Sequence, residues 1–218
     1  AFDQVVQVFQ LGIPWSVLEH SLKPFREQIT LESLGRQMLP KPERQSRNHV
    51  VGIHNVTNLL LATATAVNEG MSLADVAYRV RTLQPPESRL VRQPTASGIT
   101  IINDSYSTNP VGAISALQVL GLHKDGRRVL ITPGMVELGS EEEKENHQLG
   151  IQAAQYATDI ILVGDRQTKP IQAGIASTDF PEDHLHVVET LIEATSWYQN
   201  NLKPGDAVLF LNDLPDTY

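Results

Sequence analysis

Five short apolar runs alternate with stretches of helix length over the second half of the chain. The runs are rich in Val, Ile and Leu, a composition typical of strands that are covered on both faces. They span residues 99–104, 127–134, 159–165, 184–189 and 206–212. Helices are predicted between them at 110–122, 141–157, 167–176 and 189–201. Because parallel strands need such crossovers, residues 87–218 are predicted to form an α/β domain with a Rossmann-like, mostly parallel sheet.

Residues 1–84 lack this alternation and are predicted to be mainly helical. Apolar residues recur at helical spacing over 55–68, and a second helix with a capping-box-like start is predicted over 72–83. The Pro-Pro pair at 85–86 ends that helix and marks the predicted domain boundary. Residues 1–50 predict only short helices and a loop that carries proline and arginine, so this part is poorly defined.

The charge balance excludes one broad class of function. Among 218 residues, 17 are Lys or Arg and 25 are Asp or Glu, which gives a net charge of -8. A protein that coats nucleic acid or an anionic membrane usually carries a basic stripe, so neither role is expected. At 41% hydrophobic residues the chain has enough apolar material for a packed core.

The chain has no cysteine, which excludes a disulfide framework, a thiolate zinc site and a cysteine nucleophile. This composition fits a reducing compartment, and we expect the cytoplasm. No apolar stretch reaches the roughly 20 residues that a membrane-spanning helix needs. The sequence opens with AFDQ, without an initiator Met or a signal peptide, so we expect a piece of a longer protein.

Two common nucleotide-binding motifs are missing from the sequence. G-x-x-x-x-G-K-[ST] does not occur, so these residues contain no P-loop. G-x-G-x-x-G does not occur either, which argues against a nicotinamide cofactor in the Rossmann-like half. The chemistry must therefore rest on other residues at the carboxyl ends of the strands.

Four separated clusters stand out at or near predicted element ends. They are GIHNVTN (52–58), PPESR (85–89), NDSYSTNP (103–110) and GMVELG (134–139), with His147 after the last. In this order and spacing the clusters resemble the Mur ligases, the ATP-dependent amino-acid ligases of peptidoglycan precursor synthesis. Within that family the likeness is nearest to members that add D-alanyl-D-alanine to a UDP-muramoyl tripeptide. It covers about residues 50–165, and residues 166–218 add only a compatible fold.

The resemblance implies that Asn55 and Asn58 lie beside the adenine of the nucleotide. The two residues are three apart at a helix start and so point from nearly the same face, and a carboxamide offers both a donor and an acceptor. The alternative is that one or both cap the helix, which Asn does well. His54 is a secondary candidate, since a histidine at a helix start is more often a capping or packing residue.

For Arg89 and Asp104 the resemblance implies contacts to the nucleotide. Arg89 would reach it when the C-terminal domain closes, and Asp104, at the end of an apolar run, would contact the ribose. Arg92 competes with Arg89, because in a regular strand over 88–94 the two would face opposite ways. An exposed Arg89 that pairs with Glu87 is the structural alternative.

Several further residues are possible contacts to the incoming amine substrate. Tyr106 and its neighbours Ser105, Ser107 and Thr108 cannot be ranked, while Asn109 before Pro110 has a helix cap as its stronger interpretation. Glu137 could hold the ammonium group or organise its loop. For His147 the sequence favours a structural role and a substrate role about equally.

By the resemblance, residues 1–84 are the tail of the central ATP-binding domain and residues 87–218 the C-terminal ligase domain. ATP and Mg²⁺ are the implied cofactors, with Mg²⁺ held mainly by the absent part of the central domain. The implied partners are a UDP-muramoyl peptide, an amine similar to D-alanyl-D-alanine and the rest of the protein. The chain alone is expected to be inactive, and the segment at 85–86 is the expected hinge.

The end of the chain departs from the pattern of the D-alanyl-D-alanine-adding members. LNDLPDTY stands where they carry Lys-Gly-Ser-Arg, which leaves the amine open. Two alternatives to a muramoyl-peptide ligase remain. One is a folylpolyglutamate-synthase-like ligase, which shares the architecture, and the other is a non-catalytic binding or regulatory module, which fits the missing P-loop.

Overall fold

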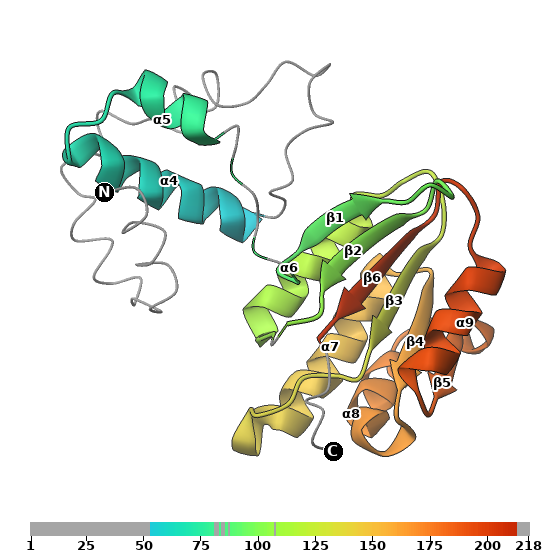
Figure 1. Ribbon diagram of the computed structural model, residues 1–218. Helices are drawn as coiled ribbons and strands as arrows, with labels where there is room; N and C mark the ends of the chain where they lie inside the picture. The colour runs from blue at the N-terminus through green and yellow to red at the C-terminus, as the bar shows by residue number, and fades with distance from the viewer. Residues whose placement is uncertain (1–52, 81–82, 84–85, 87, 107, 213–218) are drawn as a thin grey trace. The chain divides into compact units, whose positions relative to one another are not determined.

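The computed structural model describes residues 53–80, 83, 86, 88–106 and 108–212 (Figure 1). For residues 53–57 and 60 the description covers the main chain alone. The predictions for residues 1–50 lie outside the described residues. The chain divides into two compact units, residues 1–84 and 85–218, which are considered separately.

The described part of the first unit holds two helices, α4 (Ile53–Asn68) and α5 (Leu73–Val80). Gly70 follows α4 with a φ of 90°, and its amide donates to the carbonyl of Val67 at 3.0 Å. The Ser72 hydroxyl caps α5 by accepting from the amide of Asp75 at 3.1 Å. Both helices lie where the apolar spacing predicted them.

The second unit is built on a sheet of six strands in the order β1-β2-β6-β3-β4-β5. The strands are β1 (Val91–Pro94), β2 (Thr100–Asp104), β3 (Arg128–Thr132), β4 (Asp159–Val163), β5 (Leu185–Val188) and β6 (Ala207–Leu211). All neighbouring pairs are parallel except β1 and β2, which are antiparallel. The predicted α/β, mostly parallel fold is therefore confirmed.

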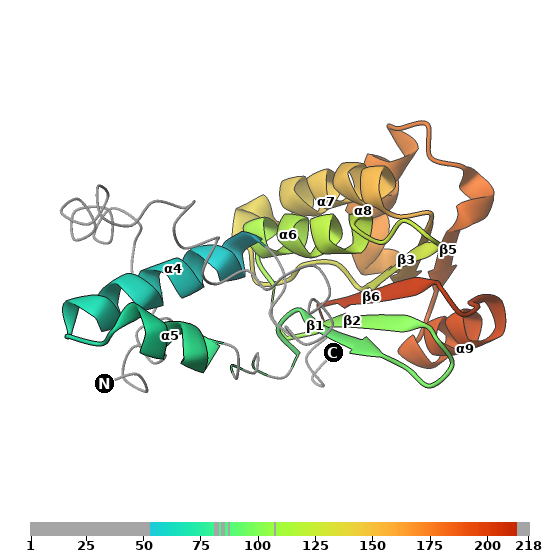
Figure 2. The ribbon, with the colours of Figure 1, turned by 90° about the horizontal axis from the view of Figure 1, so that it is seen from above.

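Helices cover both faces of the sheet unequally. Three of them, α6 (Pro110–Gly121), α7 (Glu142–Tyr156) and α8 (Asp165–Ala176), lie on one face, and α9 (Leu191–Asn201) lies on the other (Figure 2). Short 3-10 turns, η3 (Gly139–Glu141) and η4 (Glu182–His184), precede α7 and β5. Within the described ranges α9 alone covers the second face, and part of that face lies open at the carboxyl ends of the strands.

The core follows the alternation of side chains along the strands. Strand residues that point toward α9 form one cluster with Ala194 of that helix. The strand residues include Val129, Ile131, Ile161 and Val208. Their immediate neighbours Leu130, Ile160, Leu162 and Leu209 are also fully buried. Burying each such side chain stabilises the fold by about 1.5–3 kcal/mol, which explains why the central strands were easy to predict.

The five predicted strands are confirmed to within two residues at each end, but a regular strand over 88–94 is wrong at its start. The edge strand β1 begins only at Val91. Ser88 and Leu90 have φ angles of 58° and 52°, in the left-handed region, so Arg89 lies in a bend. The alternation argument that set Arg89 against Arg92 therefore does not apply.

Candidate functional site

The carboxyl ends of β2, β6 and β3 lie side by side, because β6 is inserted between the other two. The amide of Asn212, just after β6, donates to the carbonyl of Asp104 at the end of β2 at 3.0 Å. Loops leave this edge after Asp104 and after Thr132. In an open parallel sheet this is the edge at which ligands bind.

Asp104 holds the bend that precedes β1. Its Oδ1 atom accepts a hydrogen bond from the amide of Leu90 at 2.9 Å. Within the described ranges no hydrogen-bond donor reaches Oδ2. Burial raises the pKa of the Asp104 carboxyl above its ordinary value of 3.8, although the Leu90 amide and the charge of Arg89 act in the opposite direction.

Arg89 and Tyr106 meet beside this carboxylate. The guanidinium carbon of Arg89 lies 4.2 Å from the centre of the Tyr106 ring, a cation–π contact. The amide of Tyr106 also donates to the carbonyl of Ser88 at 3.2 Å. Three residues that the sequence singled out, Arg89, Asp104 and Tyr106, are thus brought together.

Two buried asparagines that the sequence analysis missed fix the GMVELG loop. Asn146 on α7 accepts from the amide of Met135 and donates to its carbonyl, both at 2.8 Å. Asn212 donates through Nδ2 to the carbonyl of Gly134 at 2.7 Å. The loop is therefore held from α7 on one side and from the end of β6 on the other.

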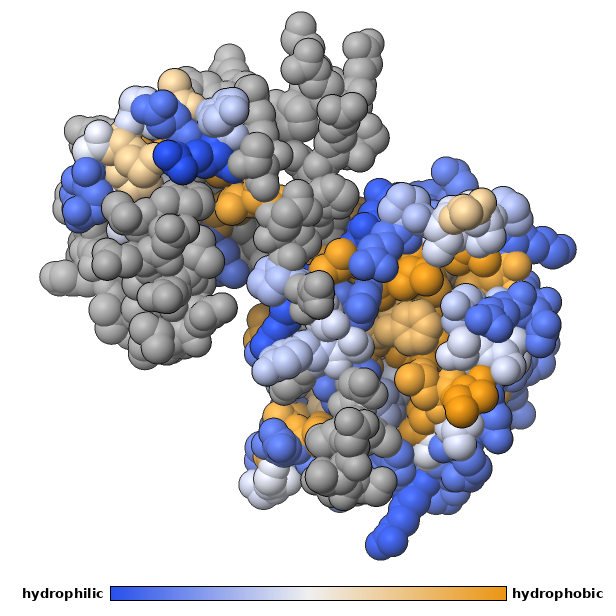
Figure 3. Space-filling model, viewed as in Figure 1, coloured by the Kyte–Doolittle hydropathy of each residue, from blue (hydrophilic) through white to orange (hydrophobic). Residues whose placement is uncertain are grey.

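A groove of about 410 Å³ opens on the less covered face of the sheet at this edge. Its apolar side chains come from neighbouring strands and include Ile101, Ile131, Val163 and Phe210. Asn103, Ser105, Glu189, Thr190 and Asn212 add polar groups. Figure 3 shows the apolar side chains gathered on the face between β1 and α9. An apolar cavity with a few polar groups is the usual form of a small-molecule site.

The remaining substrate candidates are spread along the same edge. Asn109 caps α6, since its Oδ1 accepts from the amide of Gly112 at 2.9 Å, as its stronger interpretation predicted. Glu137 is exposed and has a φ of 63°. His147 is half-buried on α7, and its carbonyl faces Gly174 on α8. The described residues that line the groove do not include Asn109, Glu137, His147 or Tyr106.

The adenine candidates belong to the first unit. The main chains of His54 and Asn55 lie in the first turn of α4, and their side chains are outside the described residues. Asn58, one turn later, is exposed. The predicted convergence of Asn55 and Asn58 with Arg89 and Asp104 joins the two units and stays a prediction.

No described helix is long and apolar enough to cross a membrane. No group of three or more His, Cys, Asp or Glu side chains within the described ranges is arranged to hold a metal ion.

Comparisons with known proteins place this geometry in a family. The family model described as "Mur ligase, glutamate ligase domain" matches residues 88–212. The UDP-N-acetylmuramoyl-tripeptide--D-alanyl-D-alanine ligase of Bacillus subtilis (strain 168) is 30% identical over 165 residues, which are 74% of this chain and 35% of the relative. The UDP-N-acetylmuramoylalanine--D-glutamate ligase of Thermoanaerobacter sp. (strain X514) is 28% identical over 161 residues, 74% of this chain and 33% of the relative.

A solved structure supports the same assignment. The crystal structure of MurF from Acinetobacter baumannii matches with a TM-score of 0.59 and 28% identity, and the match covers 74% of this chain and 34% of that one. The chain thus spans about a third of the length of the relatives it matches. With the family model matched over the whole sheet and both loops of the site, the chain belongs to the Mur ligase family.

Proposed function

We propose that this chain is the C-terminal part of an ATP-dependent ligase of peptidoglycan precursor synthesis, which adds D-alanyl-D-alanine to a UDP-muramoyl peptide. The observation that carries the proposal is the family match over residues 88–212, which includes the cluster of Arg89, Asp104 and Tyr106 at the exit of β2. The identity to the Bacillus subtilis D-alanyl-D-alanine ligase supports this choice of amine. The absence of cysteine supports the cytoplasm as its location.

The proposed reaction has two steps. The γ-phosphoryl group of ATP passes to the substrate carboxylate, and the amine then attacks the acyl phosphate to give an amide and phosphate, with ADP left from the first step. Phosphoryl transfer needs charge neutralisation by Mg²⁺ and by cationic side chains. These residues contain no P-loop, so we assign that step to the rest of the protein. This chain would contribute part of the nucleotide pocket and the site for the amine.

The residues at the exit of β2 have the chemistry that a nucleotide needs. No described donor bonds to the Oδ2 atom of Asp104, and this oxygen can accept from a sugar hydroxyl, the usual partner of an acidic residue at the end of a strand. The guanidinium of Arg89, stacked on Tyr106, can donate to phosphate oxygens. We assign the adenine to Asn55 and Asn58, with His54 as a secondary candidate.

We assign the amine substrate to the groove at the carboxyl edge of the sheet. The groove offers an apolar floor from Ile101 and Phe210 and the carboxamides of Asn103 and Asn212, a combination suited to a small dipeptide. Tyr106, Asn109, Glu137 and His147 remain candidates from the flanking loops. Each unit would carry one half of the site. Closure about the segment at 85–86, the proposed hinge, would complete it.

A titration of the isotope-labelled chain with ADP tests the nucleotide site. We expect amide resonances of residues 88–106 to shift with millimolar ADP, since half a pocket binds weakly. Asp104→Asn should reduce the affinity, because an amide replaces an oxygen acceptor by a donor. Shifts confined to other parts of the sheet, or equal affinity in the variant, would reject the nucleotide roles.

A chimera tests the whole activity. The C-terminal third of the Bacillus subtilis ligase is replaced by residues 88–212 of this chain, and phosphate release from ATP is measured with each amine. Release that depends on D-alanyl-D-alanine supports the proposal. Release with D-glutamate instead would favour a second candidate, since a D-glutamate ligase matches a similar share of the chain. A folded chimera that is silent with every amine would favour a non-catalytic module.

A further inference from the structure

The segment Ser88–Leu90, where the second unit begins its described part, adopts an unfavourable main-chain conformation. Ser88 and Leu90 both have a positive φ, and neither is a glycine. A left-handed conformation costs about 1–2 kcal/mol for each such residue. It persists only where surrounding contacts outweigh that cost. The side chain of Leu90 is one such contact, because it is only 1% exposed.

Three polar contacts hold this segment against the end of β2 and the loop that follows it. The amide of Leu90 donates to Asp104 Oδ1 at 2.9 Å, and the carbonyl of Ser88 accepts from the amide of Tyr106 at 3.2 Å. Between them the guanidinium of Arg89 stacks on the Tyr106 ring. Each residue of the segment is therefore tied to Asp104 or Tyr106 by a different interaction.

The tie at Asp104 uses the same carboxylate that we assign to the ribose. One oxygen is committed to the Leu90 amide, and within the described residues the other has no donor. Burial raises the pKa of Asp104, and the Leu90 amide and the charge of Arg89 offset this effect only in part. A further hydrogen-bond donor would therefore stabilise the charged carboxylate. A sugar hydroxyl would be such a donor.

We propose that Asp104 is a latch that joins the nucleotide site to the segment before β1, so that a bound nucleotide orders Ser88–Leu90 and the ordered segment strengthens nucleotide binding. This inference rests on the proposed nucleotide site. By linkage the two effects are equal in size. The segment follows directly on residues 85–86, which we propose as the hinge.

Amide hydrogen exchange of Leu90 in the labelled full chain reports on the latch without nucleotide. Asp104→Asn keeps an oxygen that accepts from the Leu90 amide, whereas Asp104→Ala removes it. We expect wild-type chain and Asp104→Asn to protect Leu90 alike, and Asp104→Ala to exchange about fivefold faster, the ratio expected for one lost hydrogen bond. Unchanged amide resonances of β4 in each variant would show that the variant is folded. Equal exchange in wild type and Asp104→Ala would overturn the latch.

The same measurement in millimolar ADP tests the coupling. We expect ADP to slow Leu90 exchange severalfold in the wild-type chain, to slow it less in Asp104→Asn, and to leave it unchanged in Asp104→Ala. ADP that shifts residues 88–106 while Leu90 exchange stays constant would overturn the coupling. If ADP shifts none of these resonances, the proposed nucleotide site is rejected, and the coupling with it. The exchange rates without nucleotide then still decide whether Asp104 holds the segment.

Tyr106→Leu is a second variant for the case that Asp104→Ala does not fold. It removes the ring below Arg89 and keeps both main-chain hydrogen bonds of the segment. We expect normal Leu90 protection without nucleotide and a weaker response to ADP, because the Arg89 guanidinium then loses its stacking contact with the ring. Tyr106→Phe keeps the ring and should behave as the wild type. A Leu variant that responds to ADP as the Phe variant does would reject this role of the ring.

Discussion

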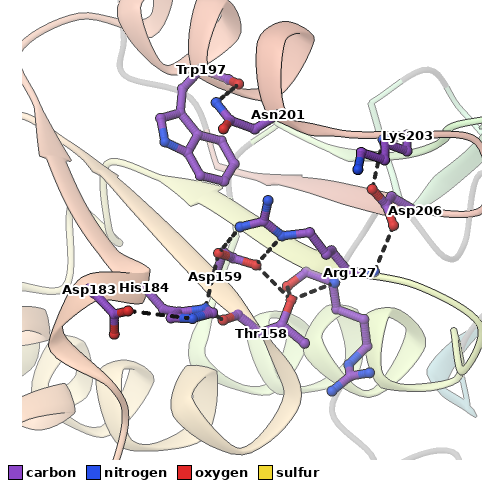
Figure 4. Close-up of polar contacts among 10 residues, drawn as sticks. Arg127, Thr158, Asp159, Asp183, His184, Trp197, Asn201, Lys203 and Asp206 are labelled. Carbon is purple, nitrogen blue, oxygen red and sulfur yellow. Dashed lines mark hydrogen bonds and ion pairs between the residues drawn. The ribbon is translucent and has the colours of Figure 1, made fainter.

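The guanidinium of Arg127 donates two hydrogen bonds to the carboxylate of Asp159 and so joins the amino ends of β3 and β4. Nε donates to Oδ2 at 2.9 Å, and Nη2 donates to Oδ1. Thr158 and His184 reach the same carboxylate at 2.8 and 3.2 Å (Figure 4). This network lies at the end of the sheet opposite to the candidate site, so its role is stability rather than chemistry.

Removal of the Asp159 carboxylate should destabilise the fold strongly. The Asp159 side chain is 1% exposed and that of Arg127 is 38% exposed, so the freed guanidinium regains some but not all of its hydration. We expect Asp159→Ala to lower the free energy of unfolding by about 2–3 kcal/mol, below the range for fully buried pairs. Asp159→Asn, which keeps one acceptor, should cost less. Urea denaturation measures both.

A surface ion pair supplies the control for this experiment. Lys144 pairs with Glu141 at 2.9 Å, and both side chains are largely exposed, at 74% and 58%. Glu141→Gln should leave the urea midpoint almost unchanged, because solvent screens such pairs. If Asp159→Ala behaved like Glu141→Gln, the network would have no role in stability.

The carboxylates of Asp159 and Asp104 should respond to pH in opposite ways. Burial alone would raise the pKa of Asp159, but hydrogen bonds from Arg127 and Thr158 outweigh it and lower the pKa below 3.8. Asp159 therefore stabilises the fold above that value, and its contribution is lost as the pH falls through the lowered pKa. Asp104, whose pKa is raised by burial, favours the fold at low pH and loses this contribution as the pH rises through its folded pKa.

Asp104→Asn is accordingly expected to raise the stability at neutral pH while it weakens ADP binding. The carboxamide keeps an acceptor for the Leu90 amide and carries no charge to desolvate. The gain should stay under about 1 kcal/mol, the scale of one hydrogen bond, and should disappear in acid, where Asp104 itself is protonated. Urea titrations at several pH values measure it. A variant that is less stable than wild type at neutral pH would show that the charge supports the fold.

The strands could be predicted because their physical cause is local. Residues 159–163 are buried on both faces, and residues 160–163 accordingly form an unbroken apolar run in the sequence. The edge strand Val91–Pro94 is mostly exposed and is held by pairing with β2, so its sequence carries no such signal. Asp104 could be placed because an apolar run ends there. The bend at Ser88–Leu90 could not, since left-handed residues are normally signalled by glycine.

The supports of the site were missed for a different reason. Asn146 and Asn212 act on main-chain groups 11 and 78 residues away, and an isolated asparagine is far more often an exposed or capping residue. Asn212 also has a φ of 61°, which asparagine tolerates better than most residues. Only the tertiary arrangement shows that both hold the loop after β3.

Asn146→Ala tests the support of that loop. Asn146 is 3% exposed, and its loss would leave the buried amide and carbonyl of Met135 without their partner. We expect a loss of about 2–3 kcal/mol in unfolding free energy, because two buried polar groups lose their bonds together. Asn109→Ala, which removes an exposed helix cap, should cost only about 1 kcal/mol. Equal losses in the two variants would contradict the assignment.

The contact between α7 and α8 depends on glycines that face each other. A Cβ atom at Gly174 would collide with the main-chain carbonyl of His147, and one at Gly150 would collide with that of Ile171. Neither obstacle is a flexible side chain, so the helices would have to move apart. Gly174→Ala should therefore lower the unfolding free energy by about 2 kcal/mol or more, as overpacked cores do.

A third helical glycine separates this steric effect from helix propensity. At Gly112 in α6 the nearest atom to an added Cβ is the Thr108 hydroxyl oxygen at 3.3 Å, the end of a side chain that can turn away. Gly112→Ala should change stability by less than about 1 kcal/mol, with the lower chain entropy of alanine in its favour. Urea denaturation of the two variants side by side gives the difference. If Gly174→Ala were as stable as Gly112→Ala, close approach of the two helices would not explain the glycines.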